Sequence, residues 1–109
     1  MQDIECVSKN SQCIEIGSNN GNLLEFLSPH FKKVLGVDPA ENIAKIANDK
    51  GIETMIEFFS EEVANTILTK FSKFQVGIAR HMFAHNNDPK KLIRAMSAVL
   101  DSQGTFIIE

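Results

Sequence analysis

The chain has 109 residues, a net charge of −3 and a hydrophobic fraction of 43%, values that are ordinary for one soluble globular domain. Its charged residues are scattered and form no basic stripe, so we do not expect a nucleic-acid partner. No apolar run approaches the roughly 20 residues of a membrane span. No signal peptide is recognisable either, so a cytoplasmic protein without a membrane partner is expected.

Cysteine usage argues against a disulfide framework and against a metal site. Cys6 and Cys13 are the only cysteines, and neither belongs to a CxxC pair. Cys13 lies in an apolar run, where a reduced and buried thiol acts as a small apolar side chain. We therefore expect no bound metal.

The first half of the chain predicts two strand–helix units. A strand over 12–16 is followed by a turn-rich loop and a helix over 23–27. A second strand over 33–37 precedes another helix, and Gly51 stands where a helix C-terminus commonly places glycine. The apolar face of this second helix is expected to comprise Ile43, Ala44, Ile46 and Ala47.

The second half continues the alternation. Strands are predicted over 52–56 and 74–79, and the helix between them starts with the capping residue Ser60 and acidic residues in its first turn. Asp88-Pro89 marks the start of the next helix, which leads through a turn to a fifth strand over 105–108. The apolar face of that last helix is expected to comprise Leu92, Ile93, Ala95, Met96, Val99 and Leu100.

This alternation predicts the fold class. Repeated strand–helix units are joined by right-handed crossovers, which makes the strands parallel. The strands are continuous apolar runs, as expected for a sheet that helices cover on both faces. The sequence thus predicts an α/β fold with a Rossmann-like, doubly wound, mostly parallel five-stranded sheet, formed by a single domain over residues 1–109.

The loop after the first strand carries the strongest functional signal. In open α/β sheets, ligands bind beyond the carboxyl ends of the strands, where the strand order reverses. Residues 15–22 read Glu-Ile-Gly-Ser-Asn-Asn-Gly-Asn, and glycines allow a sharp bend and a close approach of the backbone to a ligand. The helix that follows points its first N–H groups at the same place.

The spacing of the glycines separates two ligand classes. A dinucleotide site needs G-x-G-x-x-G, but Asn19 and Asn22 occupy the second and third glycine positions counted from Gly17. The alternative pattern, an acidic residue followed by x-G-x-x-x-G, matches at Glu15, Gly17 and Gly21. A carboxylate beside the loop would repel a pyrophosphate, whereas it suits a cation such as a sulfonium that also bears an ammonium group.

Asp38 completes the pattern. It follows the second strand about 20 residues after the first glycine, the spacing of a carboxylate that accepts hydrogen bonds from ribose hydroxyls. Dinucleotides and S-adenosylmethionine (SAM) both carry a ribose, so Asp38 indicates an adenosine ligand without choosing between them. A loop that only turns the chain is the alternative, and the register of Glu15, the loop and Asp38 with the strands favours a ligand.

These residues resemble class I SAM-dependent methyltransferases. Residues 13–21, Cys-Ile-Glu-Ile-Gly-Ser-Asn-Asn-Gly, are similar to the first motif of that family, and residues 34–40, Val-Leu-Gly-Val-Asp-Pro-Ala, are similar to its second strand with the ribose-binding acid. Phe58-Phe59 and Phe83-Ala84-His85 add a narrower resemblance to the cofactor-binding domain of sugar C-methyltransferases. The resemblance covers nearly the whole chain.

The resemblance implies SAM as the cofactor. Glu15 and Gly17 would flank the methionine part of SAM, and Asp38 would bind its ribose. Phe58 and Phe59 follow the third strand, where this family places adenine contacts, although an aromatic pair also packs well into a core. The full set of residues expected to contact or lie beside the cofactor is Glu15, Gly17, Ser18, Asn19, Gly21, Asp38, Pro39, Ala40, Phe58, Phe59 and His81.

Two histidines follow the fourth strand, in a segment that faces the first loop across the reversal of strand order. Methyl transfer needs alignment of donor and acceptor, and a base where the acceptor must lose a proton. Because histidine titrates near neutral pH, His85 is a candidate catalytic base or substrate contact, and His81 is a candidate cofactor contact. Structural or surface histidines are equally consistent with this segment, and a metal site lacks a third ligand.

The leading hypothesis is SAM-dependent methyl transfer to a small-molecule acceptor, with a sugar carbon as one candidate. Two alternatives stay open: a non-catalytic SAM- or nucleotide-binding module or pseudo-enzyme and, less favoured by the loop, an NAD-dependent oxidoreductase. The resembled family continues past a fifth strand, so the chain is expected to be part of a longer protein. The sequence leaves the acceptor and the oligomeric state open.

Overall fold

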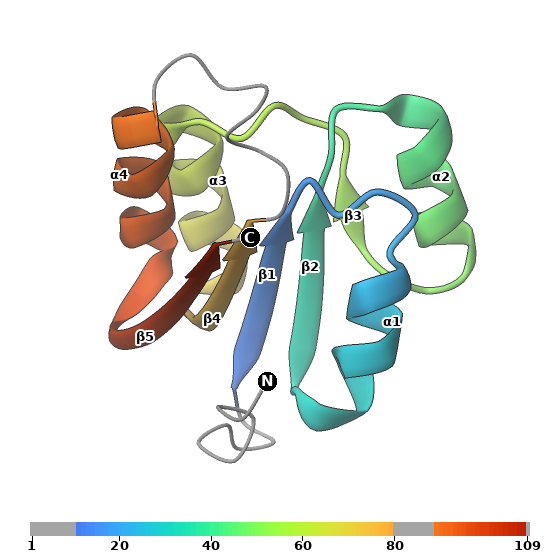
Figure 1. Cartoon of the computed structure of the whole chain (residues 1–109), viewed down its shortest axis with the longest axis horizontal. Coiled ribbons are helices and arrows are strands. Elements are labelled where there is room, and N and C mark those ends of the chain that lie inside the picture. The colour runs from blue at the N-terminus through green and yellow to red at the C-terminus, as the bar shows by residue number, and fades with distance from the viewer. Residues whose placement is uncertain (1–10, 80–88, 109) are drawn as a thin grey trace.

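The computed structural model describes residues 11–79 and 89–108, which form a sheet with helices on both faces (Figure 1). The strands are β1 (Gln12–Ile16), β2 (Lys33–Val37), β3 (Thr54–Met55), β4 (Phe74–Ala79) and β5 (Leu100–Ile108). The helices are α1 (Asn22–Leu27), the 3-10 helix η2 (Ser28–His30), α2 (Glu41–Asp49), α3 (Glu61–Phe71) and α4 (Pro89–Val99). The α/β class predicted from the sequence is confirmed.

The strand order reverses next to β1. The sheet runs β3-β2-β1-β4-β5, and every neighbouring pair is parallel. From β1 the chain moves outward to β2 and β3, and α3 then returns it to β4 on the other side of β1. The carboxyl ends of β1 and β4 are adjacent because Ile16 pairs with Ala79. In this fold class, ligands bind in the crevice at such a reversal.

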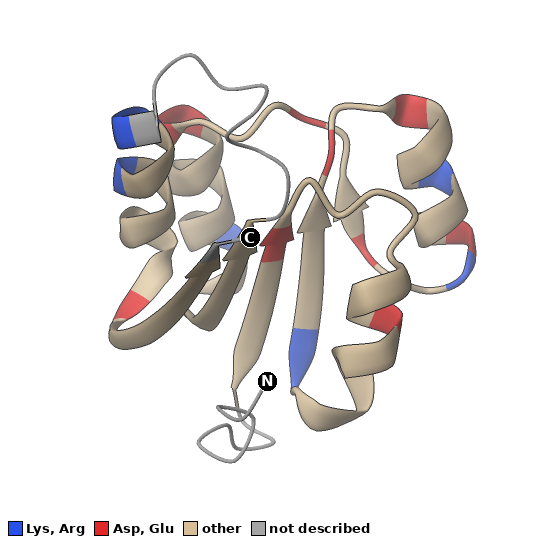
Figure 2. Ribbon diagram, in the orientation of Figure 1, with Lys and Arg blue, Asp and Glu red and all other residues tan. Residues whose placement is uncertain are grey.

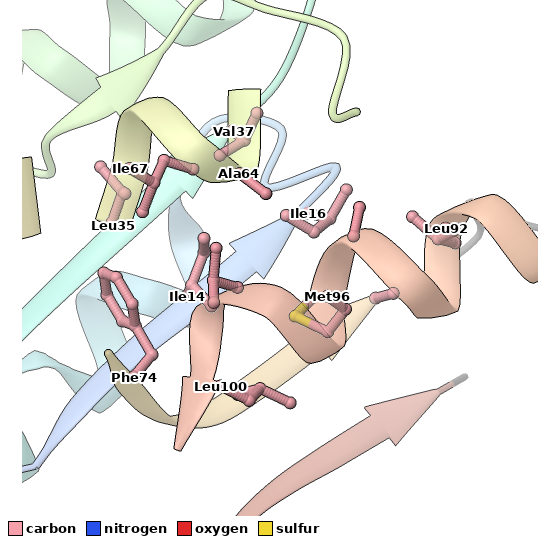
Figure 3. Close-up of a cluster of buried hydrophobic side chains, with 13 residues drawn as sticks. Ile14, Ile16, Leu35, Val37, Ala64, Ile67, Phe74, Leu92, Met96 and Leu100 are labelled. Carbon is pink, nitrogen blue, oxygen red and sulfur yellow. The ribbon is translucent and has the colours of Figure 1, made fainter. Parts of the chain in front are cut away.

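Helices cover each face of the sheet and enclose two buried clusters. As Figure 1 shows, α1 and α2 lie on one face and α3 and α4 on the other. The larger cluster joins Ile14 of β1 to Ile67 of α3 and Met96 of α4 (Figure 3). The smaller cluster packs Leu24 of α1 and Ala47 of α2 against the opposite face. This double coverage explains why the strands are apolar throughout rather than alternating.

Local signals at the helix ends agree with the structure. The Ser60 hydroxyl accepts a hydrogen bond from the N–H of Val63 over 3.2 Å and caps α3. Gly51 has a φ of 90°, and its N–H donates to the carbonyl of Asn48 over 3.0 Å at the end of α2. Pro89 opens α4, where its missing N–H has no consequence.

The third strand is shorter than predicted. Residues 52–56 were expected to be extended, but β3 comprises only Thr54–Met55. The N–H of Ile52 donates to the carbonyl of Ala47 over 2.9 Å, so this residue takes part in the turn that ends α2 rather than in the strand. Ile56 lies beyond the paired residues and is 45% exposed. Tertiary pairing, rather than apolar composition, sets the length of this edge strand.

The fifth strand is longer than predicted, because the ladder starts as soon as α4 ends. Leu100, which was expected on the face of the helix, instead pairs with Phe74. Thr105 then pairs with Val76, so the register shifts between these two pairs. The turn expected before residues 105–108 is therefore an irregularity within a continuous strand.

Two isoleucines predicted to be buried face outward. Ile46 of α2 is 55% exposed and Ile93 of α4 is 42% exposed. On α2 the fully buried residues are Ala44 and Ala47, whose small side chains let the helix lie close to its neighbours. Within residues 11–79 and 89–108, no helix has the length and apolar character needed to span a membrane.

Candidate functional site

The loop between β1 and α1 adopts a backbone that few residues tolerate. Gly17, Asn19 and Gly21 all have positive φ, at 74°, 58° and 80°. Glycine adopts this region freely, and asparagine does so more readily than most other residues. The N–H of Gly17 donates to the carbonyl of Val37 over 2.8 Å, and the N–H of Gly21 donates to that of Ser18 over 3.0 Å. The loop is therefore tied to β2 and closed on itself.

Asp38, immediately after β2, joins the loop after β1 to the loop that follows β2. Its Oδ2 accepts the N–H of Asn19 over 2.9 Å, and its Oδ1 accepts the N–H of Ala40 over 2.8 Å. The residue is 9% exposed, so both bonds lie close to the boundary between protein and solvent. A carboxylate has about four lone-pair sites, so each oxygen can accept a further hydrogen bond from a ligand hydroxyl.

Glu15 places a carboxyl group beneath the loop. It lies on β1 between the pairing positions Gly36 of β2 and Ile78 of β4, and it is fully buried. Cys13 precedes it by two residues on the same face of the strand. Burial first and the charge of Glu15 second raise the pKa of the Cys13 thiol to about 12. The thiol is thus neutral and inert, as expected from the sequence.

The side chain of Ser18 faces the sheet. It is 1% exposed, and its Oγ has no hydrogen-bond partner among the described residues. A methyl group added at Gly36 would collide with this hydroxyl and would lie 2.9 Å from Ser18 Cβ. Gly36 therefore leaves room for the loop to pack directly on β2. The cofactor contact expected from Ser18 stays a prediction.

Gly21 closes the loop against α2. A Cβ at this position would lie 3.0 Å from Ala47 Cβ and 3.3 Å from Ile52 Cγ2. Glycine is therefore required here twice, for its positive φ and for its close contact with α2. The sequence predicted a sharp bend at the loop glycines and not the contact with α2, because Ala47 lies outside the motif.

The two aromatic side chains after β3 differ in burial. Phe59 is partly buried and packs against the larger buried cluster, whereas Phe58 is 77% exposed. Core packing accounts for Phe59, and Phe58 is available to a ligand. Pro39, half-buried beside Asp38, lies at the same end of the sheet. The cofactor contacts predicted for Pro39, Phe58 and Phe59 stay predictions.

His81 and His85 lie outside the described residues, so the cofactor contact and the catalytic role predicted for them stay predictions. Among residues 11–79 and 89–108, no group of at least three His, Cys, Asp or Glu side chains is arranged to hold a metal ion.

Sequence reasoning missed Asn48, near the end of α2. Its carboxamide forms hydrogen bonds with both the N–H and the carbonyl of Thr54 in β3. No motif marks this residue, and it lies ten positions after Asp38 on an ordinary amphipathic helix. The only indication in the sequence is that the apolar stretch after this helix, residues 52–56, is short.

Acidic residues occupy several of the loops and helix starts that follow the strands, at the carboxyl edge of the sheet (Figure 2). Lys90 and Lys91 add positive charge at the start of α4. A surface of predominantly one sign raises the local concentration of ligands of opposite charge. The site is therefore better suited to a cation than to a pyrophosphate. The acidic residues of this edge are the buried Glu15, together with Asp38, Glu41, Glu57, Glu62 and Glu61, which forms an ion pair with Arg94 over 3.7 Å.

Fold and site together define an open α/β protein with a glycine-hinged loop after β1 and a carboxylate after β2, at the reversal of strand order. A family model described as a methyltransferase domain matches residues 6–109. The chain therefore belongs to this methyltransferase domain family, and its fold is that of a class I methyltransferase.

Three known proteins show the relationship. The C-methyltransferase NovU of Streptomyces niveus is 38% identical over 96 residues, which cover 88% of this chain and 23% of NovU. The crystal structure of YcgJ from Bacillus subtilis matches with a TM-score of 0.74 at 22% identity, covering 98% of this chain and 47% of that one. An S-adenosylmethionine-dependent methyltransferase from Clostridium acetobutylicum matches with a TM-score of 0.74 at 23% identity, covering 98% and 45%.

These matches differ in what they establish. The identity with NovU confirms the resemblance to C-methyltransferases, whereas the two solved structures, at their lower identity, show the shared fold alone. The chain spans less than half the length of each of these relatives. What the longer relatives bind or modify does not transfer to this chain by similarity.

Proposed function

We propose that this chain binds SAM at the carboxyl ends of β1 and β2 and forms the cofactor-binding part of an enzyme that methylates a small-molecule acceptor. The observation that carries the proposal is the position of Asp38. Its carboxylate accepts the N–H groups of Asn19 and Ala40 and keeps lone pairs for ribose hydroxyls. Membership of the methyltransferase domain family supports the same ligand.

The start of α1 argues against a pyrophosphate in the same loop. The N–H of Asn22 donates to Asn20 Oδ1 over 3.1 Å, and the N–H of Gly21 donates to the carbonyl of Ser18. A dinucleotide site would direct such N–H groups at the phosphates. Here the loop satisfies them internally, while the buried carboxyl of Glu15 lies below. Both features favour a sulfonium ligand over NAD.

The residues of the chain serve alignment more than chemistry. When bound, SAM would supply an electrophilic methyl group: as the acceptor's nucleophilic atom bonds to the methyl carbon, the carbon–sulfur bond opposite it breaks and its electron pair goes to sulfur. Asp38 would hold the ribose, and the left-handed residues of the loop would shape the backbone around the methionine part. Fixing one reactant in this way removes much of the entropic cost of bringing donor and acceptor together.

For the methyl acceptor we propose a chemical class and no particular molecule. We propose a small molecule with a carbon nucleophile, because NovU is a C-methyltransferase, and a sugar carbon is one candidate. Removing a proton from such a carbon requires a base, and His85 is the candidate that the chain offers. His81 is retained as a candidate cofactor contact. A cytoplasmic location and a single domain complete the proposal.

Calorimetry with SAM, S-adenosylhomocysteine and NADH tests the proposal. Wild-type protein is expected to bind the first two and to gain thermal stability with them. Asp38→Ala is expected to lose this binding, whereas Asp101→Ala, at the opposite end of β5, is expected to keep it. Absence of heat and of thermal stabilisation at millimolar SAM contradicts the proposal. Binding of NADH in its place favours the oxidoreductase, and SAM binding without transfer in a longer protein favours a binding module.

A further inference from the structure

The edge of β3 is closed by a side chain. β3 stands at the end of the strand order, so among the described strands only β2 pairs with it. The N–H of Gly36 donates to the carbonyl of Glu53 over 2.9 Å, and that of Asp38 donates to Met55 over 3.0 Å. Because bonding direction alternates along a strand, the N–H and carbonyl of Thr54 point away from β2. Such an edge invites pairing with another strand.

Asn48 occupies this edge with its carboxamide. Oδ1 accepts the N–H of Thr54 over 2.8 Å, and Nδ2 donates to the carbonyl of Thr54 over 3.1 Å and to that of Ala44 over 3.2 Å. The side chain thus offers Thr54 the same donor and acceptor that a neighbouring strand would offer. The orientation of the amide is fixed, because the N–H needs an acceptor and the carbonyl needs a donor.

We propose that Asn48 is a positioning residue for the cofactor site and acts through β3. Met55, next to Thr54, accepts the N–H of Asp38, and Asp38 in turn accepts the N–H of Asn19. These hydrogen bonds, together with the covalent link between Thr54 and Met55, therefore connect α2 through β3 to the loop after β1. β3 has two residues, so its own pairing with β2 holds it weakly, and the bonds from Asn48 contribute much of its order. The ligand in this inference rests on the proposed function.

The end of α2 also touches the other side of the loop. Ala47, adjacent to Asn48, lies 3.0 Å from where a Cβ on Gly21 would stand. Lys50 Nζ donates to Asn22 Oδ1 over 2.8 Å at the start of α1. One helical turn therefore contacts β3, the glycine loop and α1, which makes it a suitable place to fix the shape of the site.

Helix propensity distinguishes a positioning role of Asn48 from a role confined to α2. Asparagine is a poorer helix former than alanine. If Asn48 served only α2, Asn48→Ala would leave the site unchanged or make the protein more stable. A positioning role predicts the opposite for the site, since Thr54 would lose two hydrogen bonds and the edge of β3 would open.

The test combines amide exchange with SAM affinity in wild type, Asn48→Ala and Asn48→Asp. Asn65→Ala, an exposed asparagine on α3, is the matched control. Asn48→Ala is expected to speed exchange of the Thr54, Asp38 and Asn19 amides about tenfold in the unliganded protein and to weaken SAM binding about fivefold to tenfold. Asn48→Asp is expected to do the same, because its carboxylate repels the Thr54 carbonyl. Asn65→Ala is expected to change neither.

Faster exchange at Thr54 alone, with Asp38 and Asn19 unchanged, overturns the proposal. So does a wild-type Thr54 amide that exchanges as fast as an exposed loop amide, a result that needs no variant. If wild-type protein fails to bind SAM, the proposed function is wrong, while the exchange data still decide whether Asn48 orders Asp38. Recovery of exchange protection and affinity in Asn48→Gln, which keeps the amide, further supports positioning.

Discussion

The N–H of Asn19 donates to Oδ2 of Asp38 over 2.9 Å, which joins the loop after β1 to the residue after β2. The two residues are 19 positions apart in the sequence and lie in the loops that follow the neighbouring parallel strands β1 and β2. The carboxylate expected to hold a ribose therefore also holds the loop expected to surround the rest of the ligand. Loss of Asp38 should affect the protein before any ligand is added.

Asp38→Asn tests this double role. The amide keeps one acceptor oxygen but turns an NH₂ group toward the N–H of either Asn19 or Ala40. Leaving such a donor unsatisfied costs about 1–3 kcal/mol, so the unliganded variant should be less stable by that order. Urea denaturation measures the effect, with Asp49→Asn at the exposed end of α2 as the control. Equal stability of Asp38→Asn and wild type would contradict the role of the carboxylate in holding the loop.

Gly36 and Gly77 form a matched pair of buried strand glycines. A Cβ at Gly36 would collide with Ser18 in the loop, whereas one at Gly77 would lie 2.6 Å from Met96 Sδ, at the flexible end of a side chain. We expect Gly36→Ala to displace the loop and weaken SAM binding by about tenfold, because the new Cβ would meet the short Ser18 side chain at Oγ and Cβ, and Cβ cannot move without the loop backbone. Gly77→Ala should destabilise the protein mildly and leave the Kd for SAM unchanged.

Because the Cβ added by Gly36→Ala would collide with the Ser18 side chain, Ser18→Gly in the Gly36→Ala background should recover the affinity for SAM. Calorimetry on the single and double variants gives the coupling between the two residues. An additive result, with no recovery, would mean that the loop does not rest on Gly36.

Gly21 and Gly51 separate backbone strain from packing. Both have positive φ, at 80° and 90°, but only at Gly21 does an added Cβ meet a neighbour, Ala47, at 3.0 Å; at Gly51 nothing lies within 4 Å. Each alanine substitution should cost about 1–2 kcal/mol of backbone strain. Gly21→Ala should lose roughly 1–2 kcal/mol more from overpacking. Equal denaturation midpoints for the two variants would refute the contact with α2.

The Cys13 thiol makes the stability depend on alkaline pH. Burial and the charge of Glu15 raise its pKa from 9.0 to about 12, so the folded state keeps a proton that the unfolded state releases. This contribution is complete below pH 9 and is lost progressively as the pH rises toward 12. The unfolding free energy should therefore fall by about 1 kcal/mol between neutral pH and pH 10 through this group.

Cys13→Ala is the reference for that measurement. Other groups titrate in the same range, so the informative quantity is the difference in slope between wild type and variant. Parallel slopes between pH 8 and 10 would show that the thiol is not held protonated by the fold.

Much of this architecture can be predicted from the amino-acid sequence. The apolar runs fixed the limits of β1, β2 and β4 because these strands are buried on both faces, where composition and burial coincide. The loop motif and Asp38 were recognisable for a similar reason, since positive φ and a strand-end carboxylate leave a signature in residue type. Edge strands depend on a partner instead, which is why β3 and β5 differ from their predicted limits.

The sequence by itself determined the fold class, the strand alternation and the residues that belong to one loop, because these depend on local backbone preferences and on the period of apolar side chains. Only the tertiary structure decided that Asp38 holds that loop, that Gly36 makes room for Ser18, and that Asn48 closes the edge of β3. These contacts join residues that carry no shared pattern along the chain. They arise because parallel pairing brings the ends of separate strands together, and that proximity exists only once the sheet has formed.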